Sequence, residues 1–336
     1  MFARWLQRQW FAQRRLSPAL WLLLPLFLPL QLLFIALAAL KRKTTRPETL
    51  PVPVIVVGNI TVGGAGKTPL TIALSTALRA AGKTPGIVSR GYGGSATQPQ
   101  AVSLSDSPTV VGDEPLLMAQ RTGLPVWVGQ NRAEAARQLL AANPQVDLLL
   151  CDDGLQHYRL GRDFEIAVFD GRGAGNAWRL PLGPLREPLA RLQTLDAIVW
   201  HGSMDTRLAG ATASFQMTLQ AGRFYRLGDP AQSCDAAQLR GRKLHALAGI
   251  GHPQRFFNTL AELGLDCVHH PFPDHHAYTA EELCFGDDAV LLMTEKDAVK
   301  CSVLKTGEAW VLPIEAQLPV AFIDLVLEKI RGRPLA

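Results

Sequence analysis

Apolar residues of this 336-residue chain gather in short runs that alternate with stretches of helical spacing. Apolar runs of about four to eight residues are typical of buried strands, whereas apolar residues three or four apart indicate helices. The first half predicts strands at 54–57, 86–89, 125–128, 146–151, 166–169 and 197–200, and helices at 69–81, 114–121 and 132–142. Such alternation predicts an α/β fold with a mostly parallel sheet and helices on both faces.

The same pattern returns near the C-terminus, after a stretch between about 205 and 242 in which it is weak. There the sequence predicts strands at 244–250, 290–293 and 310–313, and helices at 253–263 and 321–330. We therefore expect a larger α/β domain over 47–220 and a smaller C-terminal α/β domain over 221–336 that closes over the larger one.

Residues 1–46 form a separate apolar and basic segment. Within it, 16–40 is a 25-residue stretch without a charge, long enough as a helix of about 1.5 Å per residue to cross a hydrocarbon core about 30 Å thick. Pro25 and Pro29 lie inside this stretch, and each removes a backbone donor. We expect a kinked or hairpin-like insertion into the cytoplasmic leaflet, with a single span as the alternative. A cleaved signal peptide fits poorly, because the apolar run is longer than an ordinary signal core.

Net charge separates this segment from the rest of the chain. The chain carries 34 Lys and Arg against 29 Asp and Glu, a net charge of +5. Residues 1–46 hold eight of the basic residues and no acidic one, so the remaining 290 residues carry −3. A basic patch on the folded domains, as nucleic-acid binding needs, is therefore not expected. Basic residues on both sides of an apolar stretch favour contact with anionic lipid head groups. The five cysteines are widely scattered, which argues against a disulfide framework.

A glycine-rich loop follows the first predicted strand directly and leads into the first predicted helix. Strand, glycines, Lys-Thr and helix together indicate a P-loop for ATP, in which backbone N–H groups surround the phosphates. The α/β fold over 47–220 is therefore expected to be of the P-loop NTPase type. Lys67 is expected to meet the β- and γ-phosphate oxygens, and the Thr68 hydroxyl to ligate Mg²⁺. One departure from the usual motif is Thr61 at the place of the first glycine. The expected nucleotide-binding residues are Thr61, Val62, Gly63, Gly64, Ala65, Gly66, Lys67 and Thr68.

A second acidic element follows the predicted strand at 146–151. Asp152 and Asp153 come at its end. An acid at the end of a strand beside the P-loop strand is the usual partner of the Mg²⁺ shell, so we expect Asp152 to hold the metal.

Further blocks point to one family. They are GNITVGGAGKT (58–68), SRGYGG (89–94), VGDEP (111–115), DDGLQH (152–157), LGPLREP (182–188), FPDH (272–275) and TEKD (294–297). Their combination and order, with the basic apolar N-terminus, resemble the lipid A 4′-kinase (tetraacyldisaccharide 4′-kinase) family. The resemblance implies transfer of the ATP γ-phosphate to the 4′-hydroxyl of tetraacyldisaccharide 1-phosphate, giving lipid IVA. It also implies a place on the cytoplasmic face of the inner membrane, with inner-membrane lipids as surroundings.

The resemblance also assigns catalytic roles. Asp113 is expected to be the base, paired with His275, and Arg186 to stabilise the transferred phosphate, while Glu187 supports Mg²⁺ or its waters. The residues alone leave simpler interpretations open: Asp113 as a helix N-cap, His275 as a surface histidine, and Arg186-Glu187 as part of a surface ion pair with Arg191.

Other assignments concern the acceptor. The resemblance implies that Tyr92, Arg132, Asp153 and His157 contact the substrate. His276 follows His275, so which imidazole meets Asp113 is open. The 294–297 block either binds nucleotide or turns the chain, and the histidines around 269–276 form a less favoured candidate metal site whose spacing matches no standard zinc pattern.

A membrane-recruited P-loop ATPase switch, of the partition and division-site type, is the competing function. Such proteins carry an extra lysine where this chain has Val62, and their membrane helices are short and reversible. We expect neither a nucleic-acid partner nor an obligate protein partner.

Overall fold

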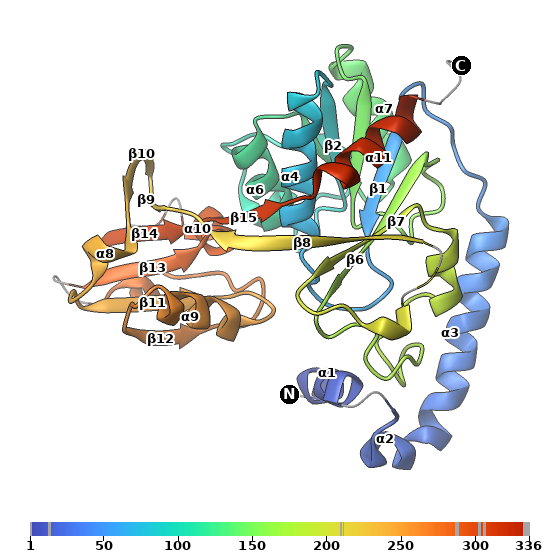
Figure 1. Ribbon diagram of the computed structural model, residues 1–336, viewed down its shortest axis with the longest axis horizontal. Helices are drawn as coiled ribbons and strands as arrows, with labels where there is room; N and C mark the ends of the chain where they lie inside the picture. The colour runs from blue at the N-terminus through green and yellow to red at the C-terminus, as the bar shows by residue number, and fades with distance from the viewer. Residues whose placement is uncertain are drawn as a thin grey trace. The chain divides into compact units, whose positions relative to one another are not determined.

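The structure is a computed structural model that describes residues 2–12, 15–208, 210, 212–285, 289–301, 304 and 307–331. Arg14, one of the N-terminal basic residues, lies outside these ranges. The chain forms two compact units (Figure 1). Unit 1 contains Met1–Ser89, Asn131–Thr218 and Leu318–Ala336, and unit 2 contains Arg90–Gln130 and Leu219–Gln317.

The N-terminal segment is helical. It comprises α1 (Phe2–Ala12), α2 (Pro18–Leu22) and α3 (Leu24–Thr44). α3 is the one helix in the described part of the chain that is long and apolar enough to cross a membrane. Pro25 lies in its first turn, where a missing N–H costs little, and Pro29 lies inside it. The helix nevertheless continues to Thr44, and the break in the segment comes at Leu23, between α2 and α3.

Side chains of these helices divide into a buried and an exposed set. Leu6, Trp10, Leu20 and Phe27 are buried in a cluster that also contains Leu182. The Trp10 indole N–H donates to the Pro181 carbonyl at 3.0 Å, and the Asn176 N–H donates to the Trp10 carbonyl at 2.8 Å. The exposed set is Trp21, Leu22, Leu26, Leu28, Leu30, Leu32, Leu33, Leu37 and Leu40. The segment is thus anchored to the body of unit 1 and presents an apolar surface, as a membrane-associated element would.

Unit 1 is built on a parallel sheet with the strand order β8-β7-β6-β1-β5-β2. The strands are β1 (Val54–Gly58), β2 (Pro85–Ser89), β5 (Leu148–Asp152), β6 (Phe164–Asp170), β7 (Ala197–His201) and β8 (Ala213–Ala221). Its helices are α4 (Lys67–Ala80), α7 (Arg132–Ala142) and α11 (Val320–Arg331), with 3₁₀ turns η1 (Leu189–Thr194) and η2 (Thr206–Leu208). β1, β2, β5 and β6 are buried along their whole length, as expected for a sheet covered on both faces.

Unit 2 contains a mixed sheet with the order β10-β9-β14-β13-β11-β12. These strands are β9 (Phe224–Arg226), β10 (Asp229–Cys234), β11 (Leu244–Ala248), β12 (Cys267–Pro271), β13 (Val290–Thr294) and β14 (Glu308–Leu312). Its helices are α5 (Pro108–Val111), α6 (Asp113–Thr122), α8 (Ala236–Leu239), α9 (Pro253–Glu262) and α10 (Glu295–Cys301), with the 3₁₀ turn η3 (Glu281–Leu283). The shorter strands β3 (Gln100–Ala101), β4 (Val126–Val128) and β15 (Ile314–Gln317) complete the elements described. The four strands β11 to β14 pair in parallel. β9 pairs antiparallel with β14, and β10 pairs antiparallel with β9.

The expected α/β class with parallel sheets is confirmed. The division expected at residue 220 differs from the units in two places. Residues 90–130 belong to unit 2, because α6 packs against α10. α11 belongs to unit 1, where it packs beside α4 and on β6, and Phe322 lies against Phe215 at 5.2 Å between ring centroids (Figure 1). A division read along the chain cannot show such exchanges, because they are made by contacts distant in sequence.

Replacing Trp10 with alanine should loosen α1 from unit 1. A buried aromatic side chain is worth about 3–5 kcal/mol when truncated in a packed cluster, and Trp10 is only 6% exposed. In detergent, Trp10→Ala should therefore be cleaved faster by protease within the N-terminal segment. Trp21→Ala is the matched control, since Trp21 is 59% exposed. Equal cleavage of the two variants would show that α1 is not held by this cluster.

Candidate active site

The predicted P-loop lies between β1 and α4. Gly63 and Gly66 have φ of +99° and +91°, backbone conformations that glycine adopts without strain. Gly66 precedes Lys67, the first residue of α4, so the loop ends at the N-terminus of a 14-residue helix. Free N–H groups and the positive end of the helix dipole make this an anion site. Val62 is partly buried against the N-terminal cluster of Leu6 and Trp10, so the loop and the apolar segment share one packing group.

A second segment runs against the start of the loop and carries Arg186 to it. The Val62 N–H donates to the Pro184 carbonyl at 2.9 Å, and the Arg186 N–H donates to the Ile60 carbonyl at 2.7 Å. Thr61 and Leu185 form an antiparallel bridge between these bonds. These contacts bring Arg186 beside the P-loop although it lies more than a hundred residues away in the sequence.

Asp153 lies between the two cations of this site. Its Oδ1 is 3.4 Å from Lys67 Nζ and 3.5 Å from Arg186 Nη1. Burial opposes its ionisation, but the charges of Lys67, Arg186 and Arg132 lower its pKa below the ordinary value. With a φ of +49° it also adopts a left-handed backbone, which is uncommon for a residue other than glycine. Asp153 is thus an anion that pairs with Lys67 and Arg186, the two cations predicted to bind phosphate.

Asp152 is the last residue of β5 and is fully buried. It lies level with Val57 of β1 in the parallel pairing, and the Thr71 hydroxyl donates to its Oδ1 at 3.3 Å. Its carboxylate and the hydroxyl of Thr68, in the first turn of α4, are the hard oxygen donors that Mg²⁺ prefers, with waters completing the octahedron. The donor set therefore fits a magnesium ion.

Glu187 is buried and engaged by protein groups. Gln156 Nε2 donates to one carboxylate oxygen at 2.6 Å, the Tyr158 hydroxyl donates to the other at 3.0 Å, and Arg191 Nε lies 3.3 Å from the second oxygen. Gln156 also accepts from Arg186 Nη1 at 3.3 Å. Glu187 therefore holds Gln156, and through it Arg186, whereas its expected support of Mg²⁺ stays a prediction.

His157 and Arg132 form another contact near Asp153. The Arg132 N–H donates to His157 Nε2 at 3.2 Å, so that nitrogen is an acceptor and the imidazole is neutral. Burial and then the charge of Arg132 lower the pKa of His157 to about 3. The ring N–H of His157 is therefore on Nδ1, and the nearby positive charge comes from Arg132, Lys41, Arg162 and Arg159.

The predicted base lies in unit 2. Asp113 opens α6, follows Gly112 and is 3% exposed. His275 Nδ1 donates to Asp113 Oδ1 at 3.0 Å, while His276 Nε2 donates to Glu282 at 3.0 Å. His275 has a φ of +59°, a backbone conformation that costs about 1–3 kcal/mol in a residue with a side chain. It is His275 that contacts Asp113 in this structure.

The glycine-rich stretch 91–94 lies against this pair. The ring of Tyr92 is 5.1 Å from the His275 imidazole between centroids, and Tyr92 is 59% exposed. A Cβ on Gly93 would come within 3.3 Å of His275 Nδ1, so glycine lets the loop approach the imidazole. Tyr92 is therefore placed to contact a ligand that reaches Asp113 and His275.

The Asp113–His275 contact affects both ionisations. Burial opposes the charge on Asp113, but the hydrogen bond from His275 and the charge of Lys296 lower its pKa below 3.8. The same hydrogen bond raises the pKa of His275 above 6.5. Near neutral pH the pair is a carboxylate with a readily protonated imidazole.

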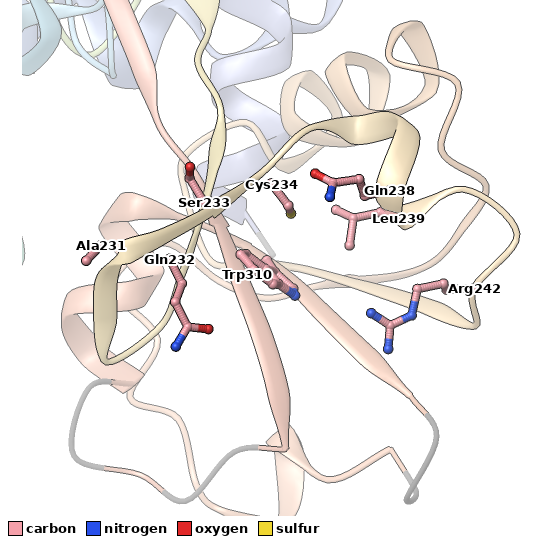
Figure 2. A pocket seen from close by; sticks show the side chains of 8 residues that line it. All are labelled: Ala231, Gln232, Ser233, Cys234, Gln238, Leu239, Arg242 and Trp310. Atoms are coloured by element: carbon pink, nitrogen blue, oxygen red, sulfur yellow. The ribbon is translucent and has the colours of Figure 1, made fainter.

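A separate pocket in unit 2 contains none of the predicted residues. Figure 2 shows side chains of β10, α8 and β14 around it, with Arg242 at one side. Its lining is Ala231, Gln232, Ser233, Cys234, Gln238, Leu239, Arg242 and Trp310. Arg242 is paired with Glu308 by hydrogen bonds of 2.6 and 2.7 Å, so its charge is already matched.

A family model described as tetraacyldisaccharide-1-P 4′-kinase matches residues 21–331 of this chain. The chain belongs to that family. A tetraacyldisaccharide 4′-kinase of Dechloromonas aromatica is 60% identical over 337 residues, covering 100% of both chains, and one of Azoarcus sp. is 50% identical over 320 residues, covering 93% of each. The crystal structure of LpxK from Aquifex aeolicus in complex with ATP is similar in fold, with a TM-score of 0.77 and 27% identity, covering 90% of this chain and 98% of that one.

Three residues of this tetraacyldisaccharide-1-P 4′-kinase family member were not predicted to belong to the site. Gln156 connects Glu187 and Arg186. Arg172 donates to the Gly64 carbonyl at 2.9 Å and lies over the Phe11 ring at 4.6 Å, so it joins the P-loop to α1. Lys296 lies among carboxylates that include Asp113. Gln156 and Lys296 lie inside the blocks that resemble the family, and this position could have marked them in the sequence. No such block contains Arg172.

The His275 imidazole should titrate above 6.5, and Asp113→Asn should lower that midpoint because the hydrogen-bonded carboxylate is lost. A folded-state pKa above the unfolded value stabilises the protein below pH 6.5, and this contribution disappears as pH rises through the folded pKa. The measurement is NMR titration of labelled histidine rings, with His275→Gln to assign the signal. An unchanged midpoint in Asp113→Asn would contradict the pairing.

Proposed function

We propose that this protein transfers the γ-phosphate of ATP to the 4′-hydroxyl of tetraacyldisaccharide 1-phosphate, forming lipid IVA in lipid A biosynthesis. The observation that carries the proposal is a P-loop with its acidic partner in a member of the 4′-kinase family. Relatives matching nearly the whole chain bear the name of that activity. The enzyme is a phosphotransferase with an alcohol as acceptor.

In this proposal the P-loop residues Thr61 to Thr68 surround the ATP phosphates. Lys67 and Arg186 exchange Asp153 for phosphate oxygens when ATP binds, since phosphate is the stronger anionic partner. Thr68 and Asp152 would hold Mg²⁺, and Glu187 would support the ion or its waters, as the family resemblance implies. When bound, the metal neutralises charge on the β- and γ-phosphates.

We propose Asp113 as the base. The acceptor oxygen forms a bond to the γ-phosphorus while the bond from that phosphorus to the β–γ bridging oxygen breaks, and the hydroxyl proton passes to Asp113. His275 orients the carboxylate and balances its charge. Asp113 and the P-loop belong to different units. The reaction therefore requires both units to act on one substrate molecule, which is the domain closure expected from the sequence.

Acceptor contacts are proposed for Tyr92, Arg132, Asp153 and His157. Tyr92 offers an exposed ring to a sugar, and Arg132 offers charge to a phosphate while His157 remains neutral. We propose that the enzyme lies on the cytoplasmic face of the inner membrane, beside its acylated substrate and anionic lipids; the exposed leucines of α3 support membrane association.

The purified chain in detergent should transfer labelled γ-phosphate to the acylated disaccharide 1-phosphate in the presence of Mg²⁺, and much less to a deacylated acceptor. Lys67→Ala should abolish transfer, since the loop loses its phosphate-binding cation, while leaving the thermal unfolding transition in place. Substrate-independent ATP hydrolysis without transfer would instead favour the partition-type ATPase switch.

Asp113→Asn should lower kcat by about 10²–10⁴-fold, the usual contribution of a general base, and leave the affinity for ATP nearly unchanged. The comparison is steady-state kinetics beside nucleotide binding, with Asp106→Asn as a control on a loop of the same unit that does not contact Asp113. Full turnover in Asp113→Asn would remove this residue from the role of base.

A further inference from the structure

Three residues of the Thr-Glu-Lys-Asp block at 294–297 form ion pairs with other parts of unit 2. It starts at the last residue of β13 and forms the first turn of α10. Asp297 is fully buried and accepts from the Tyr278 hydroxyl at 2.9 Å, the Thr294 hydroxyl at 2.7 Å and the Gly249 N–H at 3.2 Å. Its partners therefore fix the start of α10 on the sheet.

The Lys296 side chain extends from this turn to three carboxylates. Its Nζ lies 3.1 Å from Glu114 Oε1, 3.2 Å from Asp274 Oδ1 and 3.8 Å from Asp113 Oδ2. The Lys296 side chain is 17% exposed. The two oxygens of Asp113 thus have different neighbours, His275 at Oδ1 and Lys296 at Oδ2.

Asp274 extends this contact to the residue beside it. Its Oδ1 accepts from the His275 N–H at 3.1 Å as well as from Lys296. His275 has the left-handed backbone described above, which residues with side chains keep only when their surroundings hold it. Lys296 therefore joins the start of α6, which carries Asp113, to the loop that carries His275.

We infer that Lys296 is a positioning residue for the Asp113–His275 pair, holding Asp113 as a carboxylate turned toward His275. This inference rests on the proposed role of Asp113 as base. It assigns a function to a block whose sequence alone left nucleotide binding or a chain turn open.

A neighbouring ion pair of the same helices serves as a control for a purely structural role of Lys296. Glu295, the neighbour of Lys296, pairs with Arg121 at 2.5 Å and also accepts from the Ile314 N–H at 3.1 Å. The Arg121–Glu295 pair joins α6 to α10 just as Lys296 does, but it contacts neither Asp113 nor His275. Arg121→Met consequently weakens the same helix contact without touching the pair.

The charged groups that face Asp113 are known for each neighbouring element. α10 contributes Lys296 and Lys300, and the loop after β12 contributes His275, while Glu114 and Asp274 share Lys296 with Asp113. Asp274 also lies 3.8 Å from His275 Nε2, and Lys300 pairs with Asp297 at 2.8 Å. Removing the Lys296 charge therefore takes a cation from Asp113 and from the two acids that share it, so the pKa of Asp113 should rise.

The test compares pH profiles of kcat/KM for the full chain in detergent, using wild type, Lys296→Met, Lys296→Arg and Arg121→Met. We expect Lys296→Met to move the acid limb upward by about one pH unit, a typical effect of one neighbouring charge, and so to lower the rate about tenfold at a pH within that limb. Lys296→Arg, which keeps the charge, should restore the wild-type limb, and Arg121→Met should not move it.

An acid limb unchanged in Lys296→Met, or shifted equally in Arg121→Met, would overturn the inference. The His275 NMR titration is the second readout: its midpoint should change in Lys296→Met and stay in Lys296→Arg, and an unchanged midpoint in both counts against the role. The variant Asp113→Asn distinguishes failure of the proposed base from failure of the proposed role of Lys296. Full turnover in that variant overturns the base assignment together with this inference, whereas an inactive Asp113→Asn with a wild-type limb in Lys296→Met overturns the inference alone.

Discussion

β1 is paired in parallel with β5 on one side and with β6 on the other. Parallel pairing brings the carboxyl ends of β1 and β5 to one edge, so the glycine loop after Gly58 meets the acids that end β5. A shift of one residue in this register would turn Asp152 to the opposite face of the sheet. The phosphate loop, its helix and the proposed magnesium ligands all depend on this pairing.

Buried charge imposes the second constraint. Asp113 is buried and Asp153 is partly buried, and the pKa of each carboxyl is lowered by the cations beside it. Asp153 pairs with Lys67 and Arg186, which are also suited to phosphate, whereas Asp113 pairs with His275 and Lys296. In the proposed reaction, Asp153 would yield its cations to phosphate, whereas Asp113 would keep its partners and act as the base.

The N-terminal segment is part of the folded unit as well as an apolar surface. Val62 of the P-loop packs into the same cluster as Trp10, and Arg172 bridges Gly64 and the Phe11 ring. Such contacts connect the apolar N-terminal segment with the P-loop. If this segment meets the membrane as proposed, the same helices also support the proposed phosphate site.

Local pattern in the sequence determined the α/β class, the P-loop, the acid after β5 and the apolar N-terminus, since each depends on periodicity or on residues close together in the chain. The family blocks marked Asp113, His275 and Arg186, but not what holds them. Only the tertiary structure decided that His275 contacts Asp113 while His276 contacts Glu282, that Glu187 is engaged by Gln156, and that 90–130 and α11 exchange places between units. These outcomes depend on packing and ion pairs between residues far apart in sequence, whose geometry no local pattern contains.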